Sequence, residues 1–225
     1  MPDAIMLFAA GFGTRMGTLT QTRPKPLIAV AGKPLLDHAL DLVTPLGLSR
    51  VVVNSHYKAD MIAAHLDQRP VQISQEVPDI LDTGGGLRHA MPLLGTDPVM
   101  TLNTDAIWQG PNPLELLRRA WRPDDMDALL ICIPPHSALG HSGDGDFKLD
   151  DAGRMTRGPG LVYGGAQIIK TTLLAEVPDR AFSLNVIWNK MLVNNRLFGL
   201  PYPGQWCDVG HPDGITLAET LIANV

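Results

Sequence analysis

The chain of 225 residues begins with a short, continuous apolar run, residues 4–10, that ends at Gly11. An uninterrupted run of this length is typical of a strand buried on both faces of a parallel sheet. Segments with strand character then alternate with segments of helical spacing as far as residue 133. The strands are expected at 51–53, 71–74, 98–102 and 128–133, and the helices at 34–47, 59–66, 87–94 and 113–121. This alternation predicts βαβ units around a mostly parallel sheet.

The second half of the chain departs from this rhythm. Residues 146–149 and 154–156 flank a turn at 150–153, which predicts a small antiparallel hairpin inserted at about residues 140–160. The pattern then resumes with strands at 162–169, 197–201 and 206–209, a helix at 183–194 capped by its first serine, and a closing helix at 212–222. We therefore expect a single α/β domain over residues 1–225, a Rossmann-like three-layer sandwich with no further module after the last helix.

Composition and charge argue against several classes of protein. The net charge of −5 gives no general attraction to nucleic acid, so no nucleic-acid partner is expected. No apolar run reaches the roughly 18 residues that cross a bilayer, and the N-terminus lacks the basic lead of a signal peptide. A cytoplasmic protein without a membrane partner is expected. The two cysteines, Cys132 and Cys207, lie far apart, so neither a disulfide framework nor a zinc site is indicated.

The loop after the first strand indicates phosphate binding. Gly11 and Gly13 follow the strand directly, where bare backbone amides can approach phosphate oxygens. A dinucleotide fingerprint would need a third glycine in place of Met16, and the Gly-Lys-Ser/Thr end of a P-loop is absent. The loop instead ends in Arg-Pro-Lys-Pro-Leu at residues 23–27, where two prolines stiffen the backbone around Lys25. The alternative is a plain turn with solvated charges at Arg15 and Lys25.

Three segments of this region together resemble the signature of the sugar-phosphate nucleotidyltransferase family. That signature runs roughly Leu-Ala-Ala-Gly-x-Gly-Thr-Arg-Met, Pro-Lys-Pro-Leu and Gly-Lys-Pro, and it resembles residues 7–16, 24–27 and 32–34. The resemblance extends over nearly the whole chain and implies a GT-A-like nucleotidyltransferase fold, without the C-terminal acyltransferase-like extension of longer members. It also implies that Arg15 neutralises β- and γ-phosphate charge and that Lys25 contacts the phosphates near the reacting centre. The backbone that wraps the triphosphate would come from Ala9, Ala10, Gly11, Gly13 and Thr14.

Phosphoryl transfer needs charge neutralisation, which proteins usually supply as Mg²⁺ on carboxylates. Asp105 follows the strand at 98–102, and Asp208 lies in a Trp-Cys-Asp-Val-Gly segment, so both stand where an α/β sheet collects its ligands. Each resembles a metal-binding aspartate of the family, and we expect the pair to hold Mg²⁺. Taken singly, each could instead be a cap or turn residue. Thr104 stands where the family usually has glycine, a replacement that keeps the carboxylate of Asp105 but could tighten the backbone approach to the sugar.

The base-recognition segments of the family resemble residues 74–76 and 82–86. Gln75 can donate to and accept from a pyrimidine edge, and Gly84 and Gly85 would let backbone pass close to a planar base. Thr83 would join them in binding the nucleotide, although it could also serve only as a helix cap. The run Asp-Thr-Gly-Gly-Gly most resembles the N-acetylmuramate-1-phosphate uridylyltransferase branch of the family, and so does the segment at 145–154.

The sugar pocket is expected from the resemblance at Asn103, Tyr163, Gly165, Arg157 and Asn185. Glycine near Tyr163 would permit close approach to sugar hydroxyls, or would relieve crowding at a strand bulge. Many family members carry a lysine shortly before this point to hold the sugar phosphate, and this chain offers only Arg157 nearby. Guanidinium and ammonium groups are not equivalent, so whether Arg157 takes over that contact stays open.

The resemblance implies direct displacement, in which a sugar 1-phosphate oxygen attacks the α-phosphorus of a nucleoside triphosphate and pyrophosphate leaves. It favours UTP with N-acetylmuramate 1-phosphate, in cell-wall sugar recycling. Rival substrates are glucose 1-phosphate, mannose 1-phosphate with GTP, and phosphocholine with CTP. A rival of another class is an inactive nucleotide-sugar-binding regulatory subunit, against which the retention of Arg15, Lys25, Asp105 and Asp208 argues.

Overall fold

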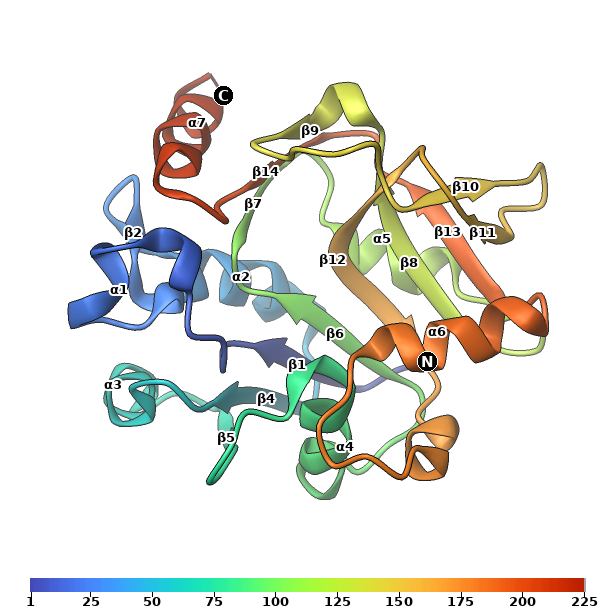
Figure 1. Ribbon diagram of the computed structural model, residues 1–225, viewed down its shortest axis with the longest axis horizontal. Helices are drawn as coiled ribbons and strands as arrows, with labels where there is room; N and C mark the ends of the chain where they lie inside the picture. The colour runs from blue at the N-terminus through green and yellow to red at the C-terminus, as the bar shows by residue number, and fades with distance from the viewer. Residues whose placement is uncertain (225) are drawn as a thin grey trace.

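The computed structural model describes residues 1–224, and its centre is a seven-stranded sheet in the order β13-β8-β12-β6-β1-β4-β5 (Figure 1). The pairs β6–β1, β1–β4 and β4–β5 are parallel, and so is β8–β13 beyond β12. The strands span Ala4–Phe8 (β1), Arg50–Ser55 (β4), Gln72–Gln75 (β5), Val99–Asn103 (β6), Ala128–Ile133 (β8), Val162–Ile169 (β12) and Leu197–Pro201 (β13).

One strand, β12, runs antiparallel to both of its neighbours, β6 and β8. Ala166 pairs with Leu102 near the end of β6, so the first residues of β12 extend past the point where β6 ends. The register with β8 shifts between Tyr163 and Gln167, as at a β-bulge. The predicted mostly parallel sheet is confirmed, and the reversed strand delivers Tyr163 to the edge at which the parallel strands finish.

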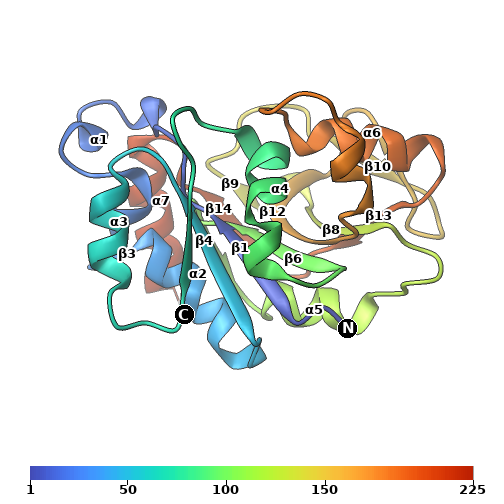
Figure 2. The same ribbon diagram turned by 90° about the horizontal axis from the view of Figure 1, so that it is seen from below.

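Helices cover both faces of this sheet, as the view from below shows (Figure 2). One buried cluster joins the strands to α2 (Leu35–Val43), α3 (Ala59–Leu66) and α5 (Pro113–Ala120). A second cluster on the opposite face joins them to α4 (Asp82–Leu94) and α6 (Leu184–Val193). The predicted three-layer α/β sandwich is therefore confirmed.

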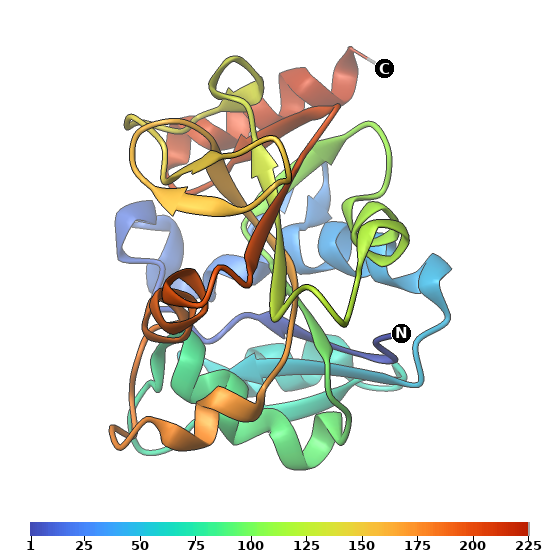
Figure 3. The ribbon, with the colours of Figure 1, turned by 90° about the vertical axis from the view of Figure 1, so that its right-hand side faces the viewer.

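A smaller layer stands beside the main sheet. Strands β7 (Ala106–Gln109), β14 (Gln205–Asp208) and β9 (Ala138–Leu139) form a three-stranded sheet, on which the C-terminal helix α7 (Pro212–Ala223) packs. In Figure 3, α7 lies in red at the top of the molecule, at the end opposite the green α4. Two-stranded antiparallel pairs are formed by β2 (Ala29–Val30) with β3 (Lys33–Pro34), and by β10 (Phe147–Leu149) with β11 (Met155–Arg157).

The connection from β1 to β2 is compact, because it contains a short helix and two 3₁₀ turns. The short elements of the chain are η1 (Thr14–Met16), α1 (Leu19–Thr22), η2 (Lys25–Leu27), η3 (Thr44–Leu46), η4 (Pro135–Ser137) and η5 (Thr172–Glu176). Met16 is buried against α7 and the small sheet, so the loop is packed onto the body of the protein.

Besides the short elements α1, β2, β3 and β9, which were not predicted, α4 and β7 differ from the expectations drawn from the sequence. Helix α4 begins at Asp82, five residues before the predicted start at residue 87. Its first turns contain three glycines, of which Gly84 and Gly85 are packed closely by residues 180–182 and Gly86 by Glu76 and Asn54. Strand β7 was not predicted, since it follows Asp105 without a turn signal and its four residues alternate only briefly. It forms because β14 pairs with it along its whole length.

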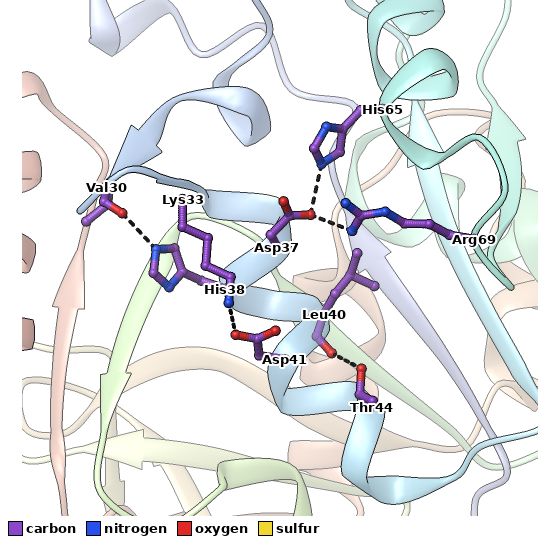
Figure 4. A network of polar contacts seen from close by, with 9 residues as sticks. All are labelled: Val30, Lys33, Asp37, His38, Leu40, Asp41, Thr44, His65 and Arg69. Carbon is purple, nitrogen blue, oxygen red and sulfur yellow. Dashed lines mark hydrogen bonds and ion pairs between the residues drawn. The ribbon is translucent and has the colours of Figure 1, made fainter.

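A polar network ties α2 to α3 beneath the loop (Figure 4). The Asp37 carboxylate accepts hydrogen bonds from His65 Nε2 at 2.8 Å and Arg69 Nη1 at 2.6 Å. Burial raises the pKa of Asp37, but the hydrogen bonds from His65 and Arg69 outweigh it and leave that pKa below its usual value. Lys33 on β3 forms a further ion pair with Asp41 on α2. These contacts hold α2 and α3 in a fixed relation under the same face of the sheet.

Among residues 1–224, no helix is long and apolar enough to cross a membrane. The two cysteines are buried thiols. Burial raises the pKa of Cys132 to about 12 and that of Cys207 to about 11. Both therefore act as neutral core residues at physiological pH.

A second ionic junction closes the far end of the sheet. Asp127, just before β8, accepts hydrogen bonds at Oδ1 from Lys170 Nζ at 3.0 Å and Arg196 Nε at 2.9 Å. Lys170 follows β12 and Arg196 precedes β13, so the carboxylate joins three strands. Burial raises the pKa of Asp127, yet the hydrogen bonds and charges of Arg196 and Lys170 dominate and lower it overall.

We predict that Asp127→Asn lowers the free energy of unfolding by about 0.5–1 kcal/mol at pH 7, since the paired charge is lost. Because the folded pKa of Asp127 is depressed, its contribution is complete above the unfolded carboxylate pKa and disappears as the pH falls through the folded value. Urea unfolding at several pH values should therefore show a constant deficit near neutrality that shrinks in acid. Asp125→Asn, at an exposed ion pair with Arg122, is the control. A deficit that grew in acid would contradict this account.

Candidate active site

The carboxyl ends of β1, β4, β5 and β6 meet at one edge of the sheet, where the loops leave a cleft of about 330 Å³. In open α/β sheets this edge is where ligands bind. The loop after β1 forms one wall, and residues that follow the other strands form the rest. The lining residues are Phe8, Ala9, Ala10, Gly11, Gly13, Thr14, Arg15, Lys25, Pro26, Asn54, Glu76, Ile80, Asp82, Thr83, Asn103, Thr104, Asp105 and Gly210.

The glycine loop has a backbone that only glycine adopts easily. Gly13 has φ 65°, and a Cβ there would lie 2.9 Å from both Lys25 Cβ and Thr20 Cγ2. The Thr20 hydroxyl lies within hydrogen-bond distance of the carbonyls of Gly13, at 3.2 Å, and Gly17, at 3.1 Å. The loop is thus folded on itself around Thr20, and all of the predicted triphosphate-wrapping residues, with Arg15, face the cleft.

Lys25 is fixed at the centre of this wall. It opens the 3₁₀ turn η2, between Pro24 and Pro26, and only 11% of its side chain is exposed. Its Nζ donates to Asp105 Oδ2 at 2.7 Å, which joins the loop to the end of β6 across 80 residues of chain. A cation held at one point by two prolines and an ion pair suits accurate placement against a phosphate.

The two predicted metal-binding aspartates lie side by side. Asp208 ends β14, which pairs with β7 so that Asp208 faces Ala106, and the Val209 N–H donates to the Asp105 carbonyl at 2.9 Å. Burial raises the pKa of Asp208, and the like charge of Asp105 adds to this, while Lys25, Arg15 and His141 act in the opposite direction. Two adjacent, partly buried carboxylates offer the hard oxygen ligands that Mg²⁺ prefers.

A buried polar chain, unforeseen from the sequence, supports the cleft from below. Asn54 Oδ1 accepts the Ala9 N–H at 2.6 Å, and its Nδ2 donates to Glu76 Oε1 at 2.7 Å. Glu76 Oε2 accepts the Leu81 N–H at 2.7 Å, and Glu76 is 1% exposed. The chain joins β1, β4 and the segment after β5, so it sets the height of the glycine loop above the sheet. The one feature of the sequence that could have indicated this chain is the polar residue Asn54 near the end of a strand with an apolar centre.

Three of the predicted base-binding residues do not line the cleft. Gln75 is exposed, and its neighbour Glu76 faces the cleft instead. The amides of Gly84 and Gly85 both donate to the Phe182 carbonyl, at 2.8 and 3.0 Å. A Cβ on Gly84 would lie 2.4 Å from the Phe182 ring, so that glycine serves packing between α4 and the segment before α6.

Thr83 does line the cleft, and the interpretation of it as a helix cap is wrong. The N-cap position of α4 is Leu81, without a side-chain cap, because the helix starts earlier than expected. Thr83 Oγ1 accepts the Leu184 N–H at 3.0 Å and so ties α4 to α6. Asp82 beside it adopts φ 58°, and its carboxylate accepts the Thr83 N–H at 2.5 Å.

A second pocket of about 270 Å³ adjoins the cleft, with which it shares Phe8, Asp82, Thr83 and Asn103. Four of the five predicted sugar-binding residues line it: Asn103, Arg157, Tyr163 and Asn185. The remaining wall consists of Asp146, Phe147, Ser183, Leu184 and Trp188. The structure thus brings together residues from β6, β11, β12 and α6 that lie up to 82 positions apart in the chain, from Asn103 to Asn185.

The fifth predicted residue, Gly165, does not line the second pocket but packs against Asn103, which does. It has φ 88°, and a Cβ there would lie 2.8 Å from Asn103 Cβ, so glycine lets β12 pass close under Asn103. Thr104, which replaces the family's glycine, is buried and donates from Oγ1 to the Phe8 carbonyl at 2.7 Å. The hydroxyl therefore locks β6 to the end of β1 instead of entering the sugar pocket.

The geometry described above is a glycine loop with a fixed lysine and two carboxylates, beside a pocket with polar and aromatic walls. The family described as "MobA-like NTP transferase domain" matches residues 5–142. The chain belongs to this family and is a nucleotidyltransferase.

Two relatives match this chain over nearly its full length and carry the same name. The chain is 38% identical to an N-acetylmuramate alpha-1-phosphate uridylyltransferase of Caulobacter vibrioides, over 99% of this chain and 98% of that protein. It is 31% identical to a protein of the same name from Neisseria meningitidis serogroup B, over 96% of each. A solved structure from Bacillus anthracis, named "Putative Glucose-1-Phosphate Thymidylyltransferase", matches with a TM-score of 0.81 at 14% identity, over 100% of this chain and 96% of that one. This likeness confirms the predicted nucleotidyltransferase fold.

We predict that Glu76→Gln lowers the free energy of unfolding by about 1–3 kcal/mol, because the new amide group opposes one of the two N–H donors that the carboxylate now accepts. Urea unfolding at pH 7 measures the change. Gln75→Ala, at the exposed adjacent position, is the matched control and should leave stability nearly unchanged. Equal stability of Glu76→Gln and the native protein would show that the buried chain does not hold the loop.

Proposed function

We propose that the protein transfers the uridylyl group of UTP to N-acetylmuramate 1-phosphate, giving the UDP-sugar and pyrophosphate. The observation that carries the proposal is the continuity of the two pockets, with Lys25 and Asp105 on the wall of the first. The printed names of the two relatives over 30% identical support the choice of base and sugar. A cytoplasmic location and a role in cell-wall sugar recycling belong to the same proposal.

The triphosphate lies along the glycine loop in this proposal. The backbone of Ala9 to Thr14 wraps the phosphates, and Arg15 neutralises the β- and γ-phosphate charge. Thr83 lines the same cleft and contacts the nucleotide. Glu76 and Asn54 support this site by fixing the backbone of Ala9.

Asp105 and Asp208 would hold Mg²⁺. The fit rests on the chemistry of the donors, because two adjacent, partly buried carboxylates offer the hard oxygen ligands that Mg²⁺ prefers. Burial and the like charge of Asp105 raise the pKa of Asp208, as expected for carboxylates held close together. A bound Mg²⁺ would supply positive charge that offsets the phosphate oxygens of both substrates. Lys25 now neutralises part of the negative charge from its place beside Asp105.

The reaction is a direct displacement. An oxygen of the sugar 1-phosphate forms a bond to the α-phosphorus, and the bond from the α-phosphorus to the oxygen that bridges to the β-phosphorus breaks. The electron pair leaves with pyrophosphate, whose charge Arg15 offsets, so no enzyme nucleophile is required. Lys25 offsets the charge that builds at the α-phosphoryl group. The sugar occupies the second pocket, where Asn103, Tyr163 and Asn185 bind and orient it.

Substrate identity is testable by pyrophosphate release. We predict that UTP with N-acetylmuramate 1-phosphate gives the highest kcat/KM in a panel that pairs each triphosphate with each candidate acceptor. The panel includes GTP with mannose 1-phosphate, CTP with phosphocholine, and glucose 1-phosphate. A higher kcat/KM for another pair would show that the proposed substrates are wrong while the proposed reaction is right. The absence of release with every pair would refute the proposal.

We predict that Asp208→Asn lowers turnover at least about 100-fold, since charge stabilisation at the reacting centre is lost. The metal-free variant should be as stable as the native protein or more so, because a raised pKa means that the charged form is disfavoured in the fold. Addition of Mg²⁺ should raise the melting temperature of the native protein but not that of the variant. Asp151→Asn, at the exposed hairpin turn, is the control. An active Asp208→Asn protein that still responds to Mg²⁺ would refute the metal assignment.

A further inference from the structure

The second pocket contains one cation, Arg157, among its lining residues. The cation is held without a carboxylate: in the part of the chain that the structure describes, its guanidinium is in none of the ion pairs found within 4.0 Å. Its Nη2 instead donates to two amide oxygens of α6, Asn185 Oδ1 at 2.6 Å and Asn189 Oδ1 at 3.1 Å. Arg157 is exposed overall, and within residues 1–224 its Nε and Nη1 donors have no protein hydrogen-bond partner, so they stay open to a ligand or to solvent.

Arg157 is also placed by aromatic rings. Its guanidinium carbon lies 4.5 Å from the centroid of Phe147, the residue directly opposite on β10, and 6.0 Å from that of Trp188. Contact with ring faces restricts a guanidinium to a plane while leaving its edges free to donate. Burial by these neighbours lowers the pKa of Arg157, and the charge of Asp146 works against that effect.

The aromatic wall behind Arg157 is itself fixed by a buried polar chain. Trp188 Nε1 donates to Gln167 Oε1 at 3.0 Å, and Gln167 Nε2 donates to Thr101 Oγ1 at 3.1 Å. Tyr163 packs edge-on against Trp188, with ring centroids 4.9 Å apart. Because β12 and β6 thereby hold Trp188 in place, the position of Arg157 is set before any ligand binds.

Arg157 lies at the far side of the pocket from the reacting centre. The second pocket meets the cleft at Phe8, Asp82, Thr83 and Asn103, and Arg157 lines only the second pocket. A sugar 1-phosphate has its phosphate on the cleft side, beside Lys25 and Asp105. The group that meets Arg157 therefore belongs to the part of the sugar remote from the phosphate.

The acids of the pocket do not satisfy this cation. Asp146 uses Oδ2 to accept the Tyr163 N–H at 2.8 Å, and it influences Arg157 only through its charge. Asp82 lies on the shared wall, where it accepts the Thr83 N–H. A neutral sugar would offer hydroxyls to these acids but would leave the free donors of Arg157 without an anion.

We propose that Arg157 binds a carboxylate carried by the sugar, and that the second pocket selects acidic sugar 1-phosphates over neutral ones. The proposal rests on the proposed uridylyltransferase function and assigns its specificity to one residue. N-Acetylmuramate carries such a carboxylate, whereas N-acetylglucosamine is the same sugar without the carboxylate-bearing substituent. Arg157 is thus a specificity-determining residue, and it is not the holder of the sugar phosphate.

The test compares the two sugar 1-phosphates with UTP and Mg²⁺ on the full chain. We predict that Arg157→Gln lowers kcat/KM for N-acetylmuramate 1-phosphate by about 10- to 100-fold, mainly through KM, as expected for loss of a charge-assisted hydrogen bond. With N-acetylglucosamine 1-phosphate the variant should match the native protein. Arg157→Lys keeps the charge and should recover part of the loss.

The matched control is Arg154→Gln, which removes an exposed arginine from the same hairpin outside the pocket and should change neither substrate. Equal losses on both sugar phosphates in Arg157→Gln would overturn the inference, because they would indicate a phosphate-binding or purely structural role. Equal use of both by the native protein would also overturn it. Turnover of neither, with activity on another acceptor in the panel, would refute the proposed function itself. Unfolding midpoints of all the variants show whether a loss arises from the fold.

Discussion

Two carboxylates of like charge, Asp105 and Asp208, stand together at the junction of the large and small sheets, and the surrounding structure compensates for them. Antiparallel pairing of β7 with β14 brings them together, although they lie 103 residues apart in the chain, from 105 to 208. The glycine loop contributes Lys25 on one side and Arg15 on the other, and both moderate the charge that raises the pKa of Asp208. Two adjacent carboxylates with cations beside them form the basis of the metal site proposed above, because Mg²⁺ prefers hard oxygen ligands.

The cleft at the glycine loop and the second pocket are each supported by a buried polar chain. Asn54 and Glu76 fix the start of the glycine loop, while Thr101, Gln167 and Trp188 fix the aromatic wall of the second pocket. In the first chain Asn54 lies on β4 and Glu76 directly follows β5, whereas the second joins Thr101 on β6 and Gln167 on β12 to Trp188 on α6. A fully bonded buried chain restricts motion more strongly than apolar contacts of the same area, because any displacement leaves a donor or acceptor unpaired. The loops that meet the substrates are therefore placed by the interior of the sheet.

Much of the fold was predictable because the strands are apolar and end abruptly. The alternation of strands and helices, the glycine loop and the positions of Asp105 and Asp208 all follow from local sequence patterns. The errors arose where tertiary contacts decide. Helix α4 begins over three glycines that residues 180–182, Glu76 and Asn54 pack against, and β7 is a strand only because β14 pairs with it. Gln75 was expected to bind the base, but it is Glu76 that lines the cleft. Successive side chains along a strand point to opposite sides, so a shift of one residue exchanges the side chain that faces the cleft. The partnership of Asn54 with Glu76 crosses 22 residues and leaves no local pattern.

The hairpin of β10 and β11 has a consequence for how this enzyme could diverge. Its register places Phe147 opposite Arg157, and Asp150 at the turn accepts the N–H groups of Ala152 and Arg154, which fixes that register. A slip of one residue would turn the guanidinium away from the pocket. It would also displace Phe147 and Met155, which are buried in the core cluster between the sheet and helices α4 and α6. The hairpin is therefore tied to the main sheet, both through this cluster and through the bridge from Arg154 to Phe198 on β13. A substitution of Arg157 that keeps these buried contacts would alter the second pocket while leaving the glycine loop and both aspartates in place.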